Sequence, residues 1–136
     1  MSYGYNGRIL RVDLGKKSIS EEQPQETLYR KYMGGSALAL YYLLKELKPG
    51  TDPLGPDNML VFMSNVVSGV PGPGLTRFTI AARSPLTGAF GEAEAGGFWG
   101  PELKLAGFDG IIFTGRSETP VYLWIKDGKC EIRDAS

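Results

Sequence analysis

The sequence lacks histidine altogether and has a single cysteine, Cys130, among its 136 residues. The absence of histidine excludes Ser-His-Asp and Cys-His catalysis, zinc or haem held by histidine, and proton transfer by an imidazole. A single cysteine excludes an internal disulfide, a four-cysteine zinc site and an iron–sulfur cluster held by this chain alone. The chain must therefore bind any ligand through backbone groups, arginines, carboxylates and hydroxyls, or the chemistry lies in another part of a larger protein.

A charge excess and a long apolar run are also missing. The 15 Lys and Arg balance 15 Asp and Glu, so the chain has no overall field that would attract nucleic acid or anionic lipid. The longest apolar run, residues 37–44, is far shorter than the about 20 residues of a membrane-spanning helix. The first eight residues do not resemble a signal peptide. We therefore expect a cytoplasmic protein with no nucleic-acid or membrane partner.

Alternating and helical patterns predict one α+β domain over residues 1–136, with antiparallel sheet and hairpins at both ends. Two main helices are expected, Ser36–Leu47 with Ser36 as its N-cap and Pro101–Ala106. A shorter helical stretch from Glu26 should be interrupted at Gly34-Gly35. The expected strands cover residues 8–14, 18–21, 59–63, 76–83, 111–113 and 121–125, with a hairpin return through 130–133.

Glycine is the residue in clear excess, with 19 in the chain, about twice the average usage of about 7%. Eight of them lie between residues 69 and 100, in two glycine-rich loops that we expect on either side of the strand carrying Arg77. Glycine lets a backbone approach a ligand, and a guanidinium binds phosphate through two N–H groups. Neither loop has a P-loop or dinucleotide-binding pattern. Loops that only build turns, with a solvated Arg77, explain the same pattern, so both interpretations stay open.

Two further features have both a functional and a structural interpretation. Glu92 and Glu94 are two residues apart, as in carboxylate pairs that bind a divalent cation or exchange protons, but also as on any solvent-facing strand edge. Cys130 is expected to be a small buried hydrophobic residue of the last hairpin. Four aromatic residues are expected in the core rather than against a ligand: Tyr41, Tyr42, Phe98 and Trp99.

Five segments, in this order and at nearly matching spacing, resemble the N-terminal domain of the tungsten-containing aldehyde:ferredoxin oxidoreductases. None of them is diagnostic alone, but the collinear set is specific and covers essentially the whole chain. Residues 120–122 and 131–136 resemble the same domain. The five segments are Gly7–Leu14, Gly34-Gly35, Ser84–Gly88, Gly96–Phe98 and Glu102–Asp109.

The resemblance implies part of a cytoplasmic enzyme of anaerobes that oxidises aldehydes to carboxylic acids and passes electrons through a [4Fe-4S] cluster to ferredoxin. It implies tungstopterin, in which tungsten or molybdenum is held by two pterins whose phosphates share a magnesium ion. The N-terminal domain would be the platform for the pterins. The chain would be a truncated, incomplete form of that domain, inactive alone, with the cluster ligands and substrate pocket in the remaining domains. An uncovered pterin face would also allow a homodimer.

By position, Arg77 resembles the arginine that contacts the pterin, and Gly96 a glycine whose backbone approaches it. The resemblance therefore implies a cofactor-binding set of Arg77, Glu94, Ala95, Gly96 and Gly97, and no catalytic residue in this chain. Glu94 stands where other members have an asparagine that helps to hold the magnesium-bridged phosphates. A carboxylate can bind magnesium but repels phosphate. The alternatives are a stand-alone, non-catalytic domain for a phosphorylated ligand and a structural or assembly module.

Overall fold

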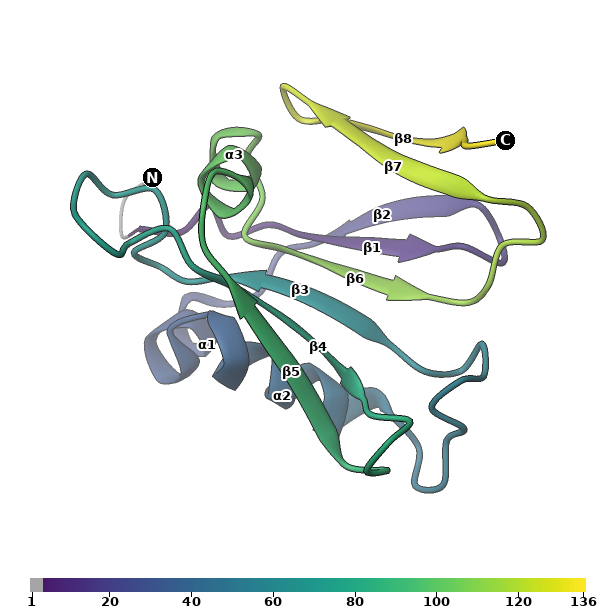
Figure 1. Cartoon of the computed structure of the whole chain (residues 1–136). Helices are drawn as coiled ribbons and strands as arrows, with labels where there is room; N and C mark the ends of the chain where they lie inside the picture. The colour runs from purple at the N-terminus through teal and green to yellow at the C-terminus, as the bar shows by residue number, and fades with distance from the viewer. Residues whose placement is uncertain (1–3) are drawn as a thin grey trace.

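The computed structural model describes residues 4–136, which form a six-stranded sheet, a separate β-hairpin and three helices (Figure 1). Met1 to Tyr3, the start of the N-terminal segment that does not resemble a signal peptide, lie outside the described residues. In chain order the elements are β1 (Ile9–Asp13), β2 (Ser18–Glu22), α1 (Glu26–Tyr32), α2 (Gly35–Glu46), β3 (Leu60–Ser64), β4 (Phe78–Arg83), β5 (Phe90–Ala95), α3 (Trp99–Leu105), β6 (Gly110–Thr114), β7 (Val121–Lys126) and β8 (Lys129–Asp134).

The strand order of the main sheet is β2-β1-β6-β3-β4-β5, which confirms the α+β class. Four of its five pairings are antiparallel, as expected, but β1 and β6 run parallel, with Ile9 opposite Gly110. The sheet is therefore mixed. This parallel pair joins segments about a hundred residues apart, and the backbone N–H of Asp109 donates to the carbonyl of Arg8 just before it, at 2.8 Å.

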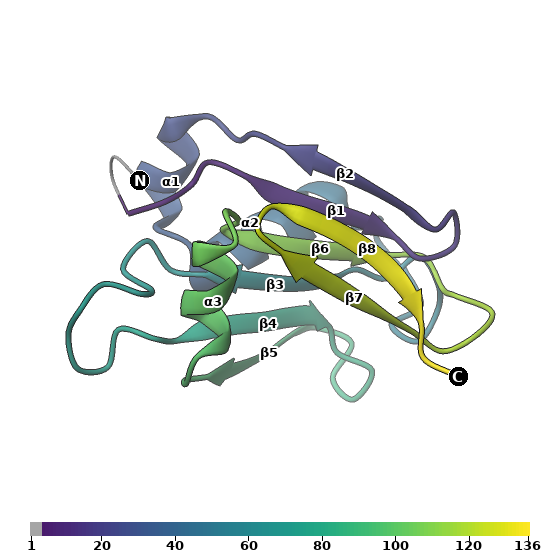
Figure 2. The same ribbon diagram turned by 90° about the horizontal axis from the view of Figure 1, so that it is seen from above.

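Both faces of the sheet are covered (Figure 2). Helices α1 and α2 lie on one face, where Leu38 and Tyr42 pack against Ile9, Val61 and other buried residues of the sheet. Helix α3 and the β7–β8 hairpin lie over the opposite face, which carries a second apolar cluster. β1 supplies both clusters through its alternating side chains, so it is buried on two sides. The buried members of the second cluster are Leu10, Val12, Leu103, Phe108 and Ile111.

The junction of α1 and α2 shows why Gly34 is needed. α1 ends at a left-handed Met33, and Gly34 has a φ of +91°. A Cβ on Gly34 would collide with the carbonyl of Ser64, because the junction pairs with Asn65 after β3. The expected break between the helices is confirmed, but the expected N-cap is wrong. α2 starts at Gly35 and has no side-chain cap, and the Ser36 hydroxyl instead donates to Glu92.

The region after β4 departs most from the expectation. Where a second glycine-rich loop was expected, Phe90–Ala95 forms the edge strand β5, paired with β4 from Phe78 opposite Ala95 to Arg83 opposite Phe90. The loop prediction is wrong because glycine and alanine have weak strand propensity, while pairing with β4 supplies the hydrogen bonds. Helix α3 begins at Trp99, two residues before the expected Pro101. None of the described helices is long and apolar enough to cross a membrane.

Candidate functional site

Arg77 lies immediately before β4, and its side chain meets that of Glu94 on β5. The guanidinium Nη1 is 3.1 Å from Glu94 Oε2, and the two side chains are 63% and 43% exposed. An exposed ion pair of this kind stabilises a protein by less than about 1 kcal/mol. Glu94 is therefore a weak partner that a ligand with a stronger negative charge can displace from Arg77.

The backbone beside this pair is open. Ala95, Gly96 and Gly97 are exposed at the end of β5. A Cβ on Gly97 would meet nothing within 4 Å, and one on Gly96 only the Thr76 hydroxyl at 3.6 Å. The Gly97 N–H donates to this hydroxyl at 3.3 Å, which keeps the segment next to Arg77. The structure thus brings all five residues of the predicted set together, with an exposed cation beside an unobstructed backbone.

Glu92 and Glu94 share a face of β5 but have different partners. Glu94 is opposite Thr79 in the register and contacts Arg77, whereas Glu92 accepts the hydroxyl of Ser36 on α2. Within residues 4–136, no group of three or more His, Cys, Asp or Glu side chains is placed to hold a metal ion. Glu94 can therefore supply one carboxylate to a magnesium ion whose other ligands would be phosphate and water oxygens, which is a common arrangement for Mg²⁺.

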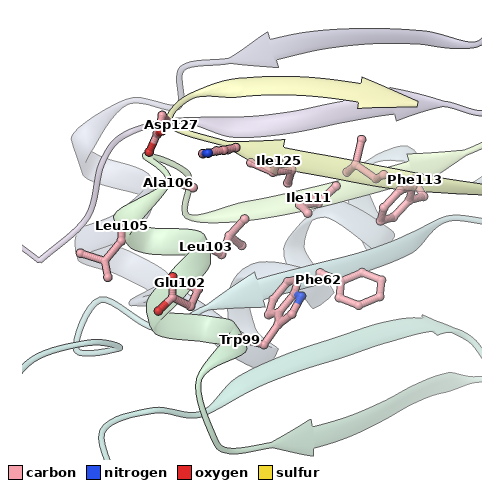
Figure 3. A pocket seen from close by; sticks show the side chains of 12 residues that line it. Phe62, Trp99, Glu102, Leu103, Leu105, Ala106, Ile111, Phe113, Ile125 and Asp127 are labelled. Atoms are coloured by element: carbon pink, nitrogen blue, oxygen red, sulfur yellow. The ribbon is translucent and has the colours of Figure 1, made fainter. Parts of the chain in front are cut away.

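A cavity of the described chain lies elsewhere. It has a volume of about 550 Å³ and lies between α3 and the β7–β8 hairpin, with Phe62, Trp99, Leu103 and Phe113 on its walls (Figure 3). None of the predicted site residues lines it. Glu94 shares its face of the sheet with the residues under α2, so the Arg77–Glu94 pair and the cavity belong to opposite faces.

The aromatic residues behave differently from one another. Tyr42 is fully buried and Tyr41 packs against the same core, as expected. Trp99 is 38% exposed and its ring centroid lies 4.4 Å from that of Phe78. Phe98 is 85% exposed, so its assignment to the core is wrong. Cys130 is partly buried against the second apolar cluster, and burial raises the pKa of its thiol, so it is a packing residue rather than a reactive one.

A buried ion pair was missed by the sequence analysis. Lys104 Nζ lies 3.4 Å from Asp109 Oδ1, and both side chains are at most 3% exposed. The Asp109 carboxylate also accepts the backbone N–H groups of Asn6, Gly7 and Arg8, at 2.7–3.3 Å. Burial lowers the pKa of Lys104, while the charge of Asp109 opposes this shift. The only sequence signal was their shared place in the segment Glu102–Asp109, since no periodic pattern marks a buried lysine.

The family model described as "Aldehyde ferredoxin oxidoreductase, N-terminal domain" matches residues 9–136. The chain belongs to this family. It is 45% identical to a tungsten-containing aldehyde ferredoxin oxidoreductase of Pyrococcus furiosus and 46% identical to one of Thermococcus kodakarensis, over 98% of its own length. An aliphatic sulfonate oxidoreductase, WOR-like subunit, of Pyrococcus furiosus is 38% identical over 98% of the chain.

The fold of the family is also found in a solved structure. The active site complex BamBC of benzoyl coenzyme A reductase, in complex with 1,5-dienoyl-CoA, matches 98% of the chain with a TM-score of 0.95 and 39% identity. The chain covers 20% of that chain and 22% of each curated relative. The relatives are oxidoreductases by name, and this chain corresponds to about a fifth of their length.

Proposed function

We propose that this chain is the cofactor-supporting N-terminal part of a tungsten or molybdenum bis-pterin oxidoreductase that oxidises aldehydes to carboxylic acids. The observation that carries the proposal is the exposed guanidinium of Arg77 beside the open backbone of Ala95–Gly97, in a chain that belongs to the aldehyde ferredoxin oxidoreductase family. The chain would position the cofactor and contribute no catalytic group, and alone it would not turn over aldehyde.

The residues at this place fit the anionic end of a pterin cofactor. Arg77 would bind a phosphate through two N–H groups, and the small residues Ala95, Gly96 and Gly97 would let the flat cofactor approach the backbone. Glu94 would move from Arg77 to a magnesium ion that the phosphates share. The metal of the cofactor would supply the redox chemistry, and in this chain no cysteine cluster contributes ligands, because Cys130 is alone.

The names of the relatives bear on the substrate. Relatives named for aldehydes, for aliphatic sulfonate and for benzoyl coenzyme A are all 38–46% identical to this chain. Such similar N-terminal parts therefore occur in enzymes that are named for different substrates. We propose that the substrate pocket, the [4Fe-4S] cluster that passes electrons to ferredoxin and the proton-handling groups belong to the remaining domains of a longer enzyme in the cytoplasm of an anaerobe.

The surface supports an interaction with such domains. Several large apolar side chains are exposed, and two of them lie at the ends of α3: Phe98 just before its first residue and Leu105 at its last, where Leu105 also lines the cavity. Exposed apolar groups of this size are unfavourable in water. We propose that the remaining domains of the same enzyme cover them, and that the isolated chain pairs with a second copy through the same surface.

Binding of inorganic pyrophosphate to the 136-residue chain, followed by calorimetry with and without Mg²⁺, tests the role of Arg77. Arg77→Ala should weaken binding at least about tenfold, since a charge-assisted bond contributes about 1.5–3 kcal/mol. Arg83→Ala is the matched control, because Arg83 lies at the far end of the same strand and donates to the Gly88 carbonyl. Equal affinities of the wild type and Arg77→Ala would refute the assignment of Arg77.

In a full-length enzyme containing this chain, the same Arg77→Ala change should lower the tungsten or molybdenum and pterin content of the purified protein. Metal analysis and pterin fluorescence measure both directly. Normal metal and pterin contents would show that Arg77 does not hold the cofactor. Aldehyde oxidation by the 136-residue chain alone would contradict the proposal that it is only the supporting part.

A further inference from the structure

Arg77 is held from behind by a buried serine. Ser68 is 2% exposed, and its hydroxyl donates to the backbone carbonyl of Arg77 at 2.7 Å. The same oxygen accepts the backbone N–H of Asn65 at 3.1 Å. Ser68 therefore joins the two ends of the glycine- and proline-rich loop between β3 and β4. The Gly69 N–H closes the loop at the same level, by donating to the Leu75 carbonyl at 3.0 Å.

Asn65 connects this serine to the buried ion pair. Its carbonyl accepts a hydrogen bond from Lys104 Nζ at 3.3 Å, and the charge of Lys104 is balanced by Asp109. A continuous chain of polar contacts thus runs from Asp109 through Lys104, Asn65 and Ser68 to the carbonyl of Arg77. The side chains of Asp109, Lys104 and Ser68 are buried, and Asn65 takes part through its backbone N–H and carbonyl. Water is therefore largely kept from these hydrogen bonds.

We propose that Ser68 is a positioning residue for Arg77. Its hydroxyl fixes the backbone of Arg77 at the end of the loop, just before β4, and so sets where the guanidinium lies relative to Glu94 and the neighbouring Ala95–Gly97. This rests on the proposed function, in which Arg77 binds the anionic part of a pterin cofactor. Ser68 touches no ligand in this arrangement and acts only through the position of Arg77.

Ser68→Ala tests the proposal, with Ser64→Ala as the matched control. Ser64 is also 2% exposed and lies four residues earlier, but its hydroxyl has no hydrogen-bond partner among the described residues. Ser68→Cys is the second variant, because a thiol nearly preserves the volume of the side chain but is a weak donor. It keeps the test decisive if the alanine variant does not fold.

Binding of inorganic pyrophosphate is the first measurement. Loss of one positioning hydrogen bond should weaken it about fivefold in Ser68→Ala and Ser68→Cys, and Ser64→Ala should bind as the wild type does. In an Arg77→Ala background, Ser68→Ala should have no further effect on affinity, because Ser68 acts through Arg77. A fivefold loss that persists without Arg77, or no loss in the single variants, would overturn the proposal.

The carbonyl ¹³C chemical shift of Arg77 and the amide exchange of Gly69 are the second measurement, and they need no ligand. Ser68→Ala should shift the Arg77 carbonyl and speed exchange at Gly69, while Ser64→Ala should change neither. An unchanged Arg77 carbonyl would overturn the proposal whatever the binding results. If Arg77→Ala alone leaves pyrophosphate affinity unchanged, the proposed function fails instead, so the two failures are distinguishable.

Discussion

Replacing Asp109 by asparagine should lower the free energy of unfolding by about 3–5 kcal/mol, because it leaves the buried ammonium of Lys104 without its counter-charge. The variant would also weaken the charge-assisted bonds that the carboxylate accepts from the N–H groups of Asn6, Gly7 and Arg8. Domains have total stabilities of about 5–15 kcal/mol, so the loss would be a large share of the whole.

Urea unfolding followed by the fluorescence of Trp99 and Trp124 measures this change. The slope with urea should stay the same, while the midpoint should fall. Asp57→Asn is the control, since Asp57 is exposed, and it should change the unfolding free energy by no more than about 0.5 kcal/mol. A loss below about 1 kcal/mol in Asp109→Asn would refute the reasoning, because removing the carboxylate that balances a buried ammonium should destabilise the fold by several times that amount.

The partner variant Lys104→Met separates charge balance from hydrogen bonding. It removes the ammonium but leaves Asp109 with its three backbone N–H donors, so the remaining charge is better satisfied than in Asp109→Asn. We expect Lys104→Met to lower the free energy of unfolding by less than Asp109→Asn does. The double variant should be more stable than the two single losses added together would predict. Simple additivity would show that the two charges do not interact.

Two other predictions concern pH and backbone geometry. Burial raises the pKa of Tyr29 and Tyr42 far above the ordinary value. Above about pH 10 the unfolded chain releases these protons while the folded chain retains them. The stability that the two tyrosines contribute is therefore complete below about pH 10 and is lost as the pH rises above it. Tyr42→Phe should flatten this alkaline decline in urea titrations, and an unchanged slope would contradict it. Gly34→Ala should lower the free energy of unfolding by about 2–4 kcal/mol, because at its positive φ a Cβ would collide with the Ser64 carbonyl. Gly50→Ala, where φ is +81° and the Cβ would meet open space, should show the effect of backbone strain alone.

Local signals account for the elements that the sequence analysis placed correctly. The alternation around Val12 and the helical spacing from Ala37 to Leu47 depend only on residues close by in the sequence. Both elements form as expected. The parallel pairing of β1 with β6 depends on contacts between segments far apart in the sequence, and no local pattern predicts such a pairing. Strand β5 was missed for the same reason, since its residues have little strand preference and only the neighbouring β4 makes them extended.

The candidate site also contains residues that the sequence suggested and residues that only the fold brings out. The family resemblance singles out Arg77 and the glycines as candidates, whereas composition alone left their role open between a phosphate site and a turn. Ser68 and Lys104 could not be found by either route, because their roles come from burial and from partners that the fold brings together. A serine next to a glycine-rich loop and a lysine in a short helix are ordinary surface residues by sequence.

Glu94 shows what the geometry adds to a residue that sequence position alone left ambiguous. A carboxylate near a phosphate site should repel the ligand, but here it is paired with the cation that would bind that ligand, at 3.1 Å. Because the pair is exposed, separating it costs less than about 1 kcal/mol, and a phosphate that binds Arg77 through two oxygens would compensate for the loss. The released carboxylate would then face the phosphates, where only a divalent cation between them removes the repulsion. Anion binding by this chain should therefore depend more strongly on magnesium than binding by a relative with asparagine at this position.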